Sequence, residues 1–149
     1  MDLTQYTWRH LTDPTETGYL VDYEVAMLDW DLDSRSCDFL LRFGPNGGHC
    51  PRHRHVGITS TLVLEGEHHV TELRSDGSTV EKVKPVGTHG LSTGDEHAHL
   101  ERGGPDGAVI FFSNQAPNGV LYELIDAEGN VIAEVGIEDL VRGWGPTGD

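Results

Sequence analysis

The sequence contains little of what several large classes of protein require. Its 149 residues include two cysteines, Cys37 and Cys50, which are too few for a disulfide-rich scaffold. Ten lysines and arginines stand against 25 aspartates and glutamates, and the formal net charge of −15 disfavours nucleic acids and anionic membrane surfaces as partners. No apolar run approaches the roughly 18 residues of a membrane span. The sequence shows no phosphate-binding glycine loop and no Ser-His-Asp nucleophile motif.

The length and the N-terminus favour a single intracellular domain. A chain of 149 residues fits one domain, which we place at 1–149. Residues 1–5 lack the basic and apolar regions of a signal peptide, so we expect a cytoplasmic protein.

Short apolar runs separated by glycine and proline predict an all-β fold. Alternation of apolar and polar residues predicts a strand at 37–43, and the Ser-Asp-Gly-Ser sequence at 75–78 predicts a hairpin turn. Only residues 137–144 show helical spacing. We therefore expect an antiparallel β-sandwich or barrel with one short C-terminal helix. Further strands are predicted at 61–64, 69–73, 79–83, 108–112, 120–125 and 131–135.

Two of the nine histidines have the spacing of metal ligands. His53 and His55 are separated by one residue, and side chains at i and i+2 of a strand point to the same face. Two imidazoles placed in this way can share one transition-metal ion if a third ligand comes from elsewhere in the chain.

The spacing around this pair resembles the first motif of the cupin superfamily. Five residues separate Gly47 from His53, three separate His55 from Thr59, and six separate Thr59 from Gly66. Thr59 stands where that motif usually carries Glu. Residues 87–101 resemble the second motif, in which a single histidine follows a glycine by three positions, as His97 follows Gly94 here. The resemblance implies a cupin-like antiparallel β-barrel, also called a double-stranded β-helix or jelly roll, with metal motifs at 47–66 and 87–101.

The C-terminal part, from residue 97 onward, is similar to the small cupin dioxygenases that cleave acetylacetone and related diketones. Dioxygenases of dihydroxyacetophenone and the cupin domains of some anti-sigma factors look related. The resemblance implies one Fe(II) ion per chain, held by His53, His55 and His97 without a carboxylate; Zn, Ni or Mn are the alternative metals. Leu91, Ser60 and Thr61 stand where the diketone-cleaving enzymes carry polar pocket residues, so the metal ligands are carried over and the substrate-facing groups are not.

Other residues near the second motif are candidates for the same site. On a strand, His99 and Glu101 would share a face with His97. His99 could be a fourth ligand, and Glu101 could accept the N–H of a ligand, so both are candidate catalytic residues. The alternative is that they line the barrel mouth in contact with water. His68 and His69 point to opposite faces, so at most one of them faces the cavity.

The resemblance, together with the histidine pair, implies a non-haem Fe(II)-dependent dioxygenase. The substrate, a small β-dicarbonyl or aryl ketone, would bind as an enolate through two oxygens, and O₂ would cleave a C–C bond. A non-redox metal would instead support isomerase, hydrolase or lyase chemistry, and a metal-binding sensory module is the remaining alternative. The acidic composition favours a small neutral organic substrate, with no nucleic acid or membrane partner. Open sheet edges favour a homodimer or homotetramer.

Overall fold

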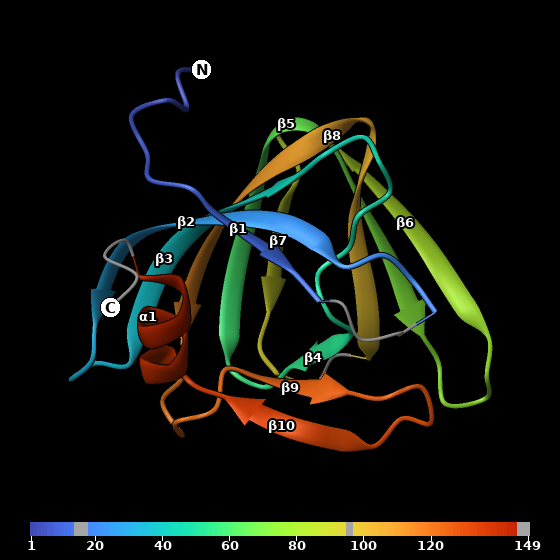
Figure 1. Ribbon diagram of the computed structural model, residues 1–149. Helices are drawn as coiled ribbons and strands as arrows, with labels where there is room; N and C mark the ends of the chain where they lie inside the picture. The colour runs from blue at the N-terminus through green and yellow to red at the C-terminus, as the bar shows by residue number, and fades with distance from the viewer. Residues whose placement is uncertain (14–17, 95–96, 146–149) are drawn as a thin grey trace.

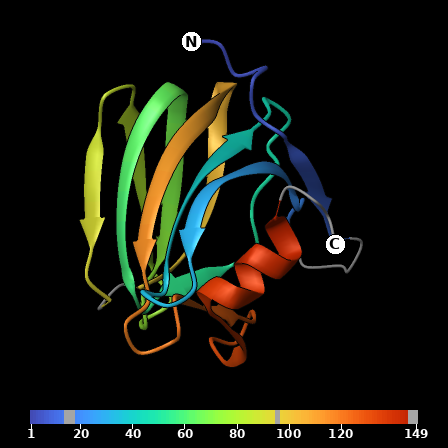
Figure 2. The ribbon, with the colours of Figure 1, turned by 90° about the vertical axis from the view of Figure 1, so that its left-hand side faces the viewer.

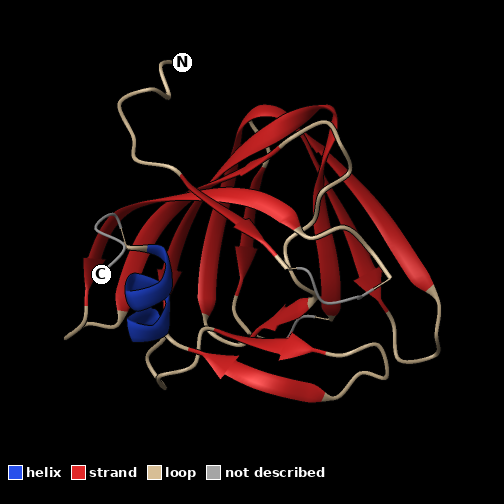
Figure 3. Cartoon of the chain, viewed as in Figure 1, coloured by secondary structure: helices blue, strands red, loops and turns tan. Residues whose placement is uncertain are grey.

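A computed structural model describes residues 1–13, 18–94 and 97–145 of the chain. Strand dominates this part, with one short helix near the C-terminus (Figure 3). No helix in it has the length and hydropathy to cross a membrane. The elements in chain order are β1 (Arg9–Thr12), β2 (Asp22–Asp31), β3 (Ser36–Phe43), β4 (His53–His55), β5 (Ile58–Leu73), β6 (Thr79–Pro85), β7 (His89–Ser92), β8 (Ala98–Gln115), β9 (Tyr122–Ile125), β10 (Val131–Val135) and α1 (Ile137–Trp144).

The strands form one antiparallel sheet that curls into a barrel. Its main path runs β1-β2-β3-β8-β4-β9-β10, while β5 pairs with β6, β7 and β8. Figure 1 shows the long strands as the barrel wall, with β4, β9 and β10 across its lower end, and Figure 2 shows their common curvature from the side. The all-β antiparallel barrel with a short C-terminal helix is therefore confirmed.

The wall is built on two unusually long strands, β5 and β8, which pair along most of their length. The sequence predicts two separate strands at 61–64 and 69–73, but the structure joins them into one bent strand. The bend lies at Gly66, which has a positive φ of 69° and lies where the register with β8 shifts. A glycine here bends the strand without ending it, because the β8 backbone continues to pair on both sides.

Two local predictions are confirmed at residue level. The turn at 75–78 joins β5 to β6, and its backbone is closed by hydrogen bonds between Arg74 and Ser78 and between Gly77 and Arg74. The helix predicted at 137–144 is α1. The backbone N–H of Gly136 donates to the Asp139 carboxylate at 2.9 Å, which satisfies one of the unpaired N–H groups at the helix start.

The apolar core fills the half of the barrel that α1 covers. Phe39 of β3 stacks on Phe112 of β8 with ring centroids 5.0 Å apart, and Trp144 of α1 meets Phe39 edge-on at 5.2 Å. Ile137 and Leu140 bury the inner face of the helix. Apolar side chains dominate this half, and the polar side chains of the barrel interior gather beside it around β4, β5 and β8.

Candidate metal centre

Four side chains converge inside the barrel from two strands. His53 and His55 come from β4, and His99 and Glu101 come from β8. One ligand-type atom of each lies within 4.8 Å of those of the other three, and all four side chains are buried. The alternation of a strand explains both pairs, because residues i and i+2 point to the same face. The pairing of β4 with β8 then brings the pairs together, with His53 directly opposite His99.

A backbone contact sets the protonation of the His53 ring. Nδ1 of His53 lies 2.7 Å from the carbonyl oxygen of Pro51. Because a carbonyl can only accept a hydrogen bond, Nδ1 carries the proton, and the neutral ring presents the lone pair of Nε2. That nitrogen lies 3.0 Å from Oε2 of Glu101. Two lone pairs facing each other at this distance need a proton or a metal cation between them.

A chain of side-chain hydrogen bonds orients His55. Nδ2 of Asn114 donates to the carbonyl oxygen of Cys37 at 3.1 Å, so Oδ1 of Asn114 faces the other way and accepts from the Thr59 hydroxyl at 3.0 Å. The Thr59 oxygen then accepts from Nδ1 of His55 at 3.1 Å. With its proton on Nδ1, His55 has Nε2 as its ligand atom. Thr59, which stands where the first motif usually carries Glu, therefore positions the ring of His55 within the cluster.

The electrostatics of the cluster favour a cation. Burial lowers the pKa of His55 well below its usual value, and the neighbouring His53 and His99 add to this, so the ring is neutral. Burial alone would raise the pKa of Glu101. Interactions with the neighbouring imidazoles of His53, His68 and His99 outweigh burial and hold that pKa well below its usual value. The cluster therefore combines a neutral imidazole at His55 with an ionised carboxylate.

Glu101 is held from behind by His68 of β5. Nε2 of His68 donates to Oε1 of Glu101 at 2.7 Å, and this leaves Oε2 turned toward His53 and His99. The His68 ring is buried and stacks on Phe43 with centroids 6.4 Å apart. His68, and not His69, is therefore the member of that pair that faces the interior. The sequence showed that His68 and His69 point to opposite faces, but it did not show that His68 contacts Glu101.

The donor set fits a divalent transition-metal ion. Nδ1 of His53, His55 and His99 donates to Pro51 O, Thr59 Oγ1 and His97 O respectively, which leaves one nitrogen of each ring as a ligand. With Oε2 of Glu101 they form a set of three imidazoles and one carboxylate. Imidazole suits Fe, Zn, Ni and Cu, and the carboxylate also suits Mn.

The structure does not place His97 in this cluster, where the sequence predicts the third ligand. His97 is exposed and precedes the first residue of β8, and its carbonyl oxygen lies 3.3 Å from Nδ1 of His99. The register of β4 on β8 pairs His53 with His99. His97 lies two residues, or about 7 Å, further along the strand direction. Residues 95 and 96 of the second motif lie outside the described residues.

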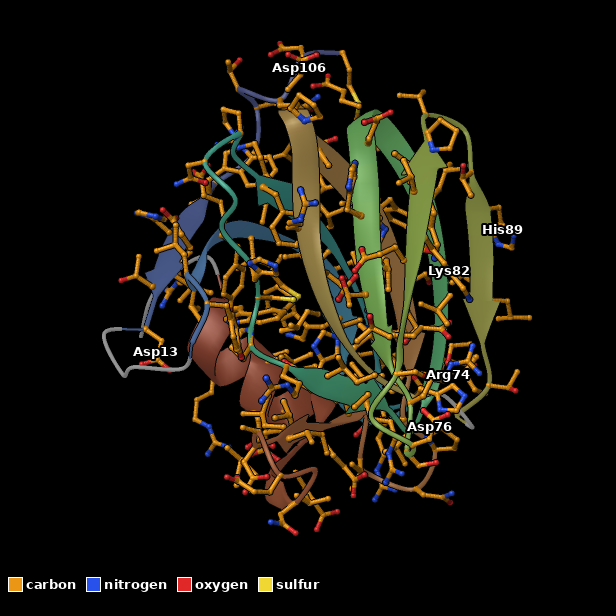
Figure 4. The ribbon with its side chains drawn as sticks, turned by 90° about the vertical axis from the view of Figure 1, so that its right-hand side faces the viewer. Asp13, Arg74, Asp76, Lys82, His89 and Asp106 are labelled. Carbon is orange, nitrogen blue, oxygen red and sulfur yellow. The ribbon has the colours of Figure 1, made fainter. Side chains whose placement is uncertain are left out.

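The surroundings of the cluster differ from the expected site in one respect, and two nearby residues of β7 are exposed. The resemblance implies a site without a carboxylate, whereas in the structure Glu101 lies within the cluster. His89 is exposed on β7, and Figure 4 shows its side chain pointing away from the barrel. Leu91 is exposed, and it lines a cavity next to the cluster together with Thr61.

Two cavities meet at the cluster, and His55, Glu101 and Phe112 line both of them. The first, which we call the apolar cavity, has a volume of about 300 Å³ and lies under α1. The second, which we call the polar cavity, has a volume of about 320 Å³ and lies between β5, β6 and β7. The apolar cavity is lined by residues that include Phe39, Leu41, Leu121, Leu124, Leu140 and Trp144. The polar cavity is lined by residues that include Thr61, His68, Lys82, Lys84, Gly90 and Ser92.

Comparison with known proteins identifies the fold. No family model matches the sequence, and no curated protein matches it. The structure is similar to a proposed acetylacetone dioxygenase from Methylibium petroleiphilum, with a TM-score of 0.67 and 18% identity over 97% of this chain and 92% of that one. An acetylacetone dioxygenase from Acinetobacter johnsonii has a TM-score of 0.58 and 19% identity, covering 91% and 84%. A cupin-like protein from Thermotoga maritima has a TM-score of 0.62 and 15% identity, covering 95% and 96%. At these identities the likeness concerns the fold, and it confirms the resemblance implied by the two histidine motifs: the chain has the cupin fold.

Proposed function

We propose that the chain is a metal-dependent dioxygenase that cleaves a C–C bond of a small dicarbonyl or aryl ketone. The observation that carries this proposal is the buried convergence of His53, His55, His99 and Glu101 within 4.8 Å. Two similar structures are described as acetylacetone dioxygenases, one of them as a proposed one, which supports the same class of reaction. We propose Fe(II) as the metal, with Glu101 as its carboxylate ligand.

A metal ion bound by these four residues would supply Lewis-acid stabilisation of an enolate and, if it is iron, electrons for reaction with O₂. The overall reaction of a 1,3-dicarbonyl R–CO–CH₂–CO–R′ with O₂ gives R–COOH and R′–CO–CHO. One C–C bond breaks, and both oxygen atoms of O₂ appear in the products. The carboxylate ligand offsets one of the two charges of a divalent ion, so the centre still attracts an anionic enolate.

The surrounding residues hold the ligands and exclude water. Thr59 and Asn114 fix the ring of His55, and His68 fixes the carboxylate of Glu101. Ring contacts on the far side come from Tyr122, whose centroid lies 5.3 Å from that of His53. The apolar cavity can hold the carbon skeleton of a small substrate away from bulk water, which strengthens electrostatic interactions at the cluster.

The decisive experiment is anaerobic purification with metal analysis, followed by O₂-electrode traces with a panel of 1,3-dicarbonyls and hydroxylated aryl ketones. We expect close to one equivalent of iron per chain and O₂ uptake that depends on a member of the panel. Tightly held zinc with no uptake for any member, even after reconstitution with Fe(II), would overturn the dioxygenase proposal. That result would favour a non-redox cupin enzyme or a metal-binding sensory module.

A further inference from the structure

The only two lysines of the chain both line the polar cavity. Lys82 and Lys84 are two residues apart on β6, so they lie on the same face of the strand. Figure 4 labels Lys82 on this strand. In a chain with 25 acidic residues and a net charge of −15, both lysines lie at one cavity, which the carboxylates of Glu72 and Glu101 also line.

The two lysines differ in how their charge is balanced. Lys82 forms an ion pair with Glu72, and Arg74 also contacts that carboxylate at 2.8 Å. Lys84 is half-buried, and among residues 1–13, 18–94 and 97–145 no carboxylate lies within ion-pair distance of it. Its cross-strand partner on β5 is His68, the residue that holds Glu101. Within the described part of the chain, Lys82 has an ion-pair partner and Lys84 has none, so the Lys84 ammonium can pair with a bound anion.

The space in front of Lys84 is shaped by a glycine on β7. A Cβ atom built on Gly90 would lie 3.8 Å from Nζ of Lys84 and 2.8 Å from Oγ1 of Thr61. The missing side chain therefore leaves room between an ammonium group and a hydroxyl. Two residues further along β7, Ser92 also lines the cavity, and its buried hydroxyl has no hydrogen-bond partner within the described chain.

An ammonium group and two hydroxyls are the donors that a carboxylate accepts from. We propose that the polar cavity binds the carboxylate of an anionic substrate, with Lys84 as its ion partner and Thr61 and Ser92 as hydrogen-bond donors. Resting on the proposed function, this defines the substrate class as a small 1,3-dicarbonyl that carries a carboxylate, that is, a 2,4-dioxo acid. The dicarbonyl end lies at the four-residue cluster and the carboxylate at Lys84.

This substrate class differs from the neutral substrate that the acidic composition favours. The net charge of the whole chain slows the approach of an anion, but the groups that touch the bound carboxylate decide its affinity. In the diketone-cleaving enzymes that the sequence resembles, the polar pocket residues stand at positions occupied here by Leu91, Ser60 and Thr61. Lys84 instead provides a cationic group at a different place in the barrel, on β6.

The test is calorimetric binding to the Zn(II)-loaded protein, in which redox turnover does not interfere. The two probes are 2,4-dioxopentanoate and its neutral counterpart pentane-2,4-dione. We expect the dioxo acid to bind at least about tenfold more tightly, the size of effect typical of a hydrogen bond to a charged group. Lys84→Met should abolish this preference, whereas the matched variant Lys82→Met should keep it, because Lys82 is already paired with Glu72.

A second variant tests the space in front of the ammonium. The backbone at Gly90 does not have positive φ, so Gly90→Ala is compatible with the strand. Its added methyl group should weaken binding of the dioxo acid more than binding of the dione. Equal affinity for the two probes in the wild type, or an unchanged preference in Lys84→Met, would overturn the carboxylate site. A preference that depends on Lys84 but is accompanied by no O₂ uptake with iron would leave the carboxylate site standing and refute the dioxygenase instead.

Discussion

His53 and His99 face each other across the antiparallel pairing of β4 and β8, with ring centroids 4.4 Å apart and ring planes at 69°. Their Nε2 atoms lie 3.0 and 3.4 Å from the same oxygen, Oε2 of Glu101. Each ring is held by a backbone carbonyl at its other nitrogen. This relationship builds the centre: β4 supplies two histidines, β8 supplies the third and the carboxylate, and the register of the two strands decides which residues meet.

The first prediction separates His99 from His97 as the metal ligand. His99→Ala should lose the bound metal, because it removes one of four convergent donor atoms. His97→Ala should retain about one equivalent, since His97 is exposed and contributes its backbone carbonyl rather than its ring. Metal analysis of both variants after identical anaerobic reconstitution measures this. A His97→Ala protein without metal, together with a metal-loaded His99→Ala protein, would reverse the assignment.

The second prediction concerns Thr59, which accepts the Nδ1 proton of His55. Thr59→Val keeps the shape of the side chain but removes this acceptor, so the ring loses its fixed tautomer. Metal affinity should fall by roughly 10- to 100-fold while the fold remains. Competition with a chelator measures the affinity. Thr71→Val on the same strand is the control, because the Thr71 hydroxyl donates to Glu81 on the surface. The metal affinity of this variant should equal that of the wild type. Equal affinities for all three proteins would show that Thr59 does not position His55.

The third prediction tests the bend of β5. A Cβ atom on Gly66 would lie 2.1 Å from the backbone oxygen of Gly107, whereas one on Gly77 would meet no atom within 4 Å. Both glycines have positive φ, so each alanine variant pays a similar conformational cost of about 1–2 kcal/mol. The free energy of unfolding should therefore fall further in Gly66→Ala than in Gly77→Ala, by roughly another 1–3 kcal/mol from the steric clash. Urea denaturation of the two variants provides the comparison, and equal losses would mean that the β5 and β8 backbones separate easily here.

The fourth prediction concerns alkaline pH. Burial raises the pKa of the Cys37 thiol to about 12, from an ordinary value of 9.0. Between these values the native state keeps the proton and the unfolded state releases it, so stability decreases as pH rises through this window. The loss from this group approaches about 1.4 kcal/mol per pH unit. Unfolding curves from pH 8 to 11 should have a shallower decline in Cys37→Ala than in the wild type. Identical slopes for the two proteins would show that the thiol ionises normally in the folded state.

The local features of this protein followed from the sequence by itself. Alternating residues predicted the strand at 37–43, which the structure has at Ser36–Phe43. The turn residues predicted the hairpin at 75–78, and helical spacing predicted α1 at Ile137–Trp144. The i, i+2 spacing of His53 and His55 also determined that they share a face. The strand, the turn, the helix and the shared face each depend on residues close together in the sequence, so the segment itself contains the interactions that cause them.

Only the tertiary structure decided which histidine and which carboxylate gather with His53 and His55. His97, His99 and Glu101 have the same parity on β8, so alternation alone could not choose among them. The choice depends on the register that pairs His53 with His99, across 45 intervening residues. That register is a non-local property: it depends on how β8 pairs with β3, β4 and β5 together, and a shift of two residues would keep every side chain on its face while bringing His97 opposite His53. The pairing of both β6 and β7 with β5 likewise places Lys84 near Gly90.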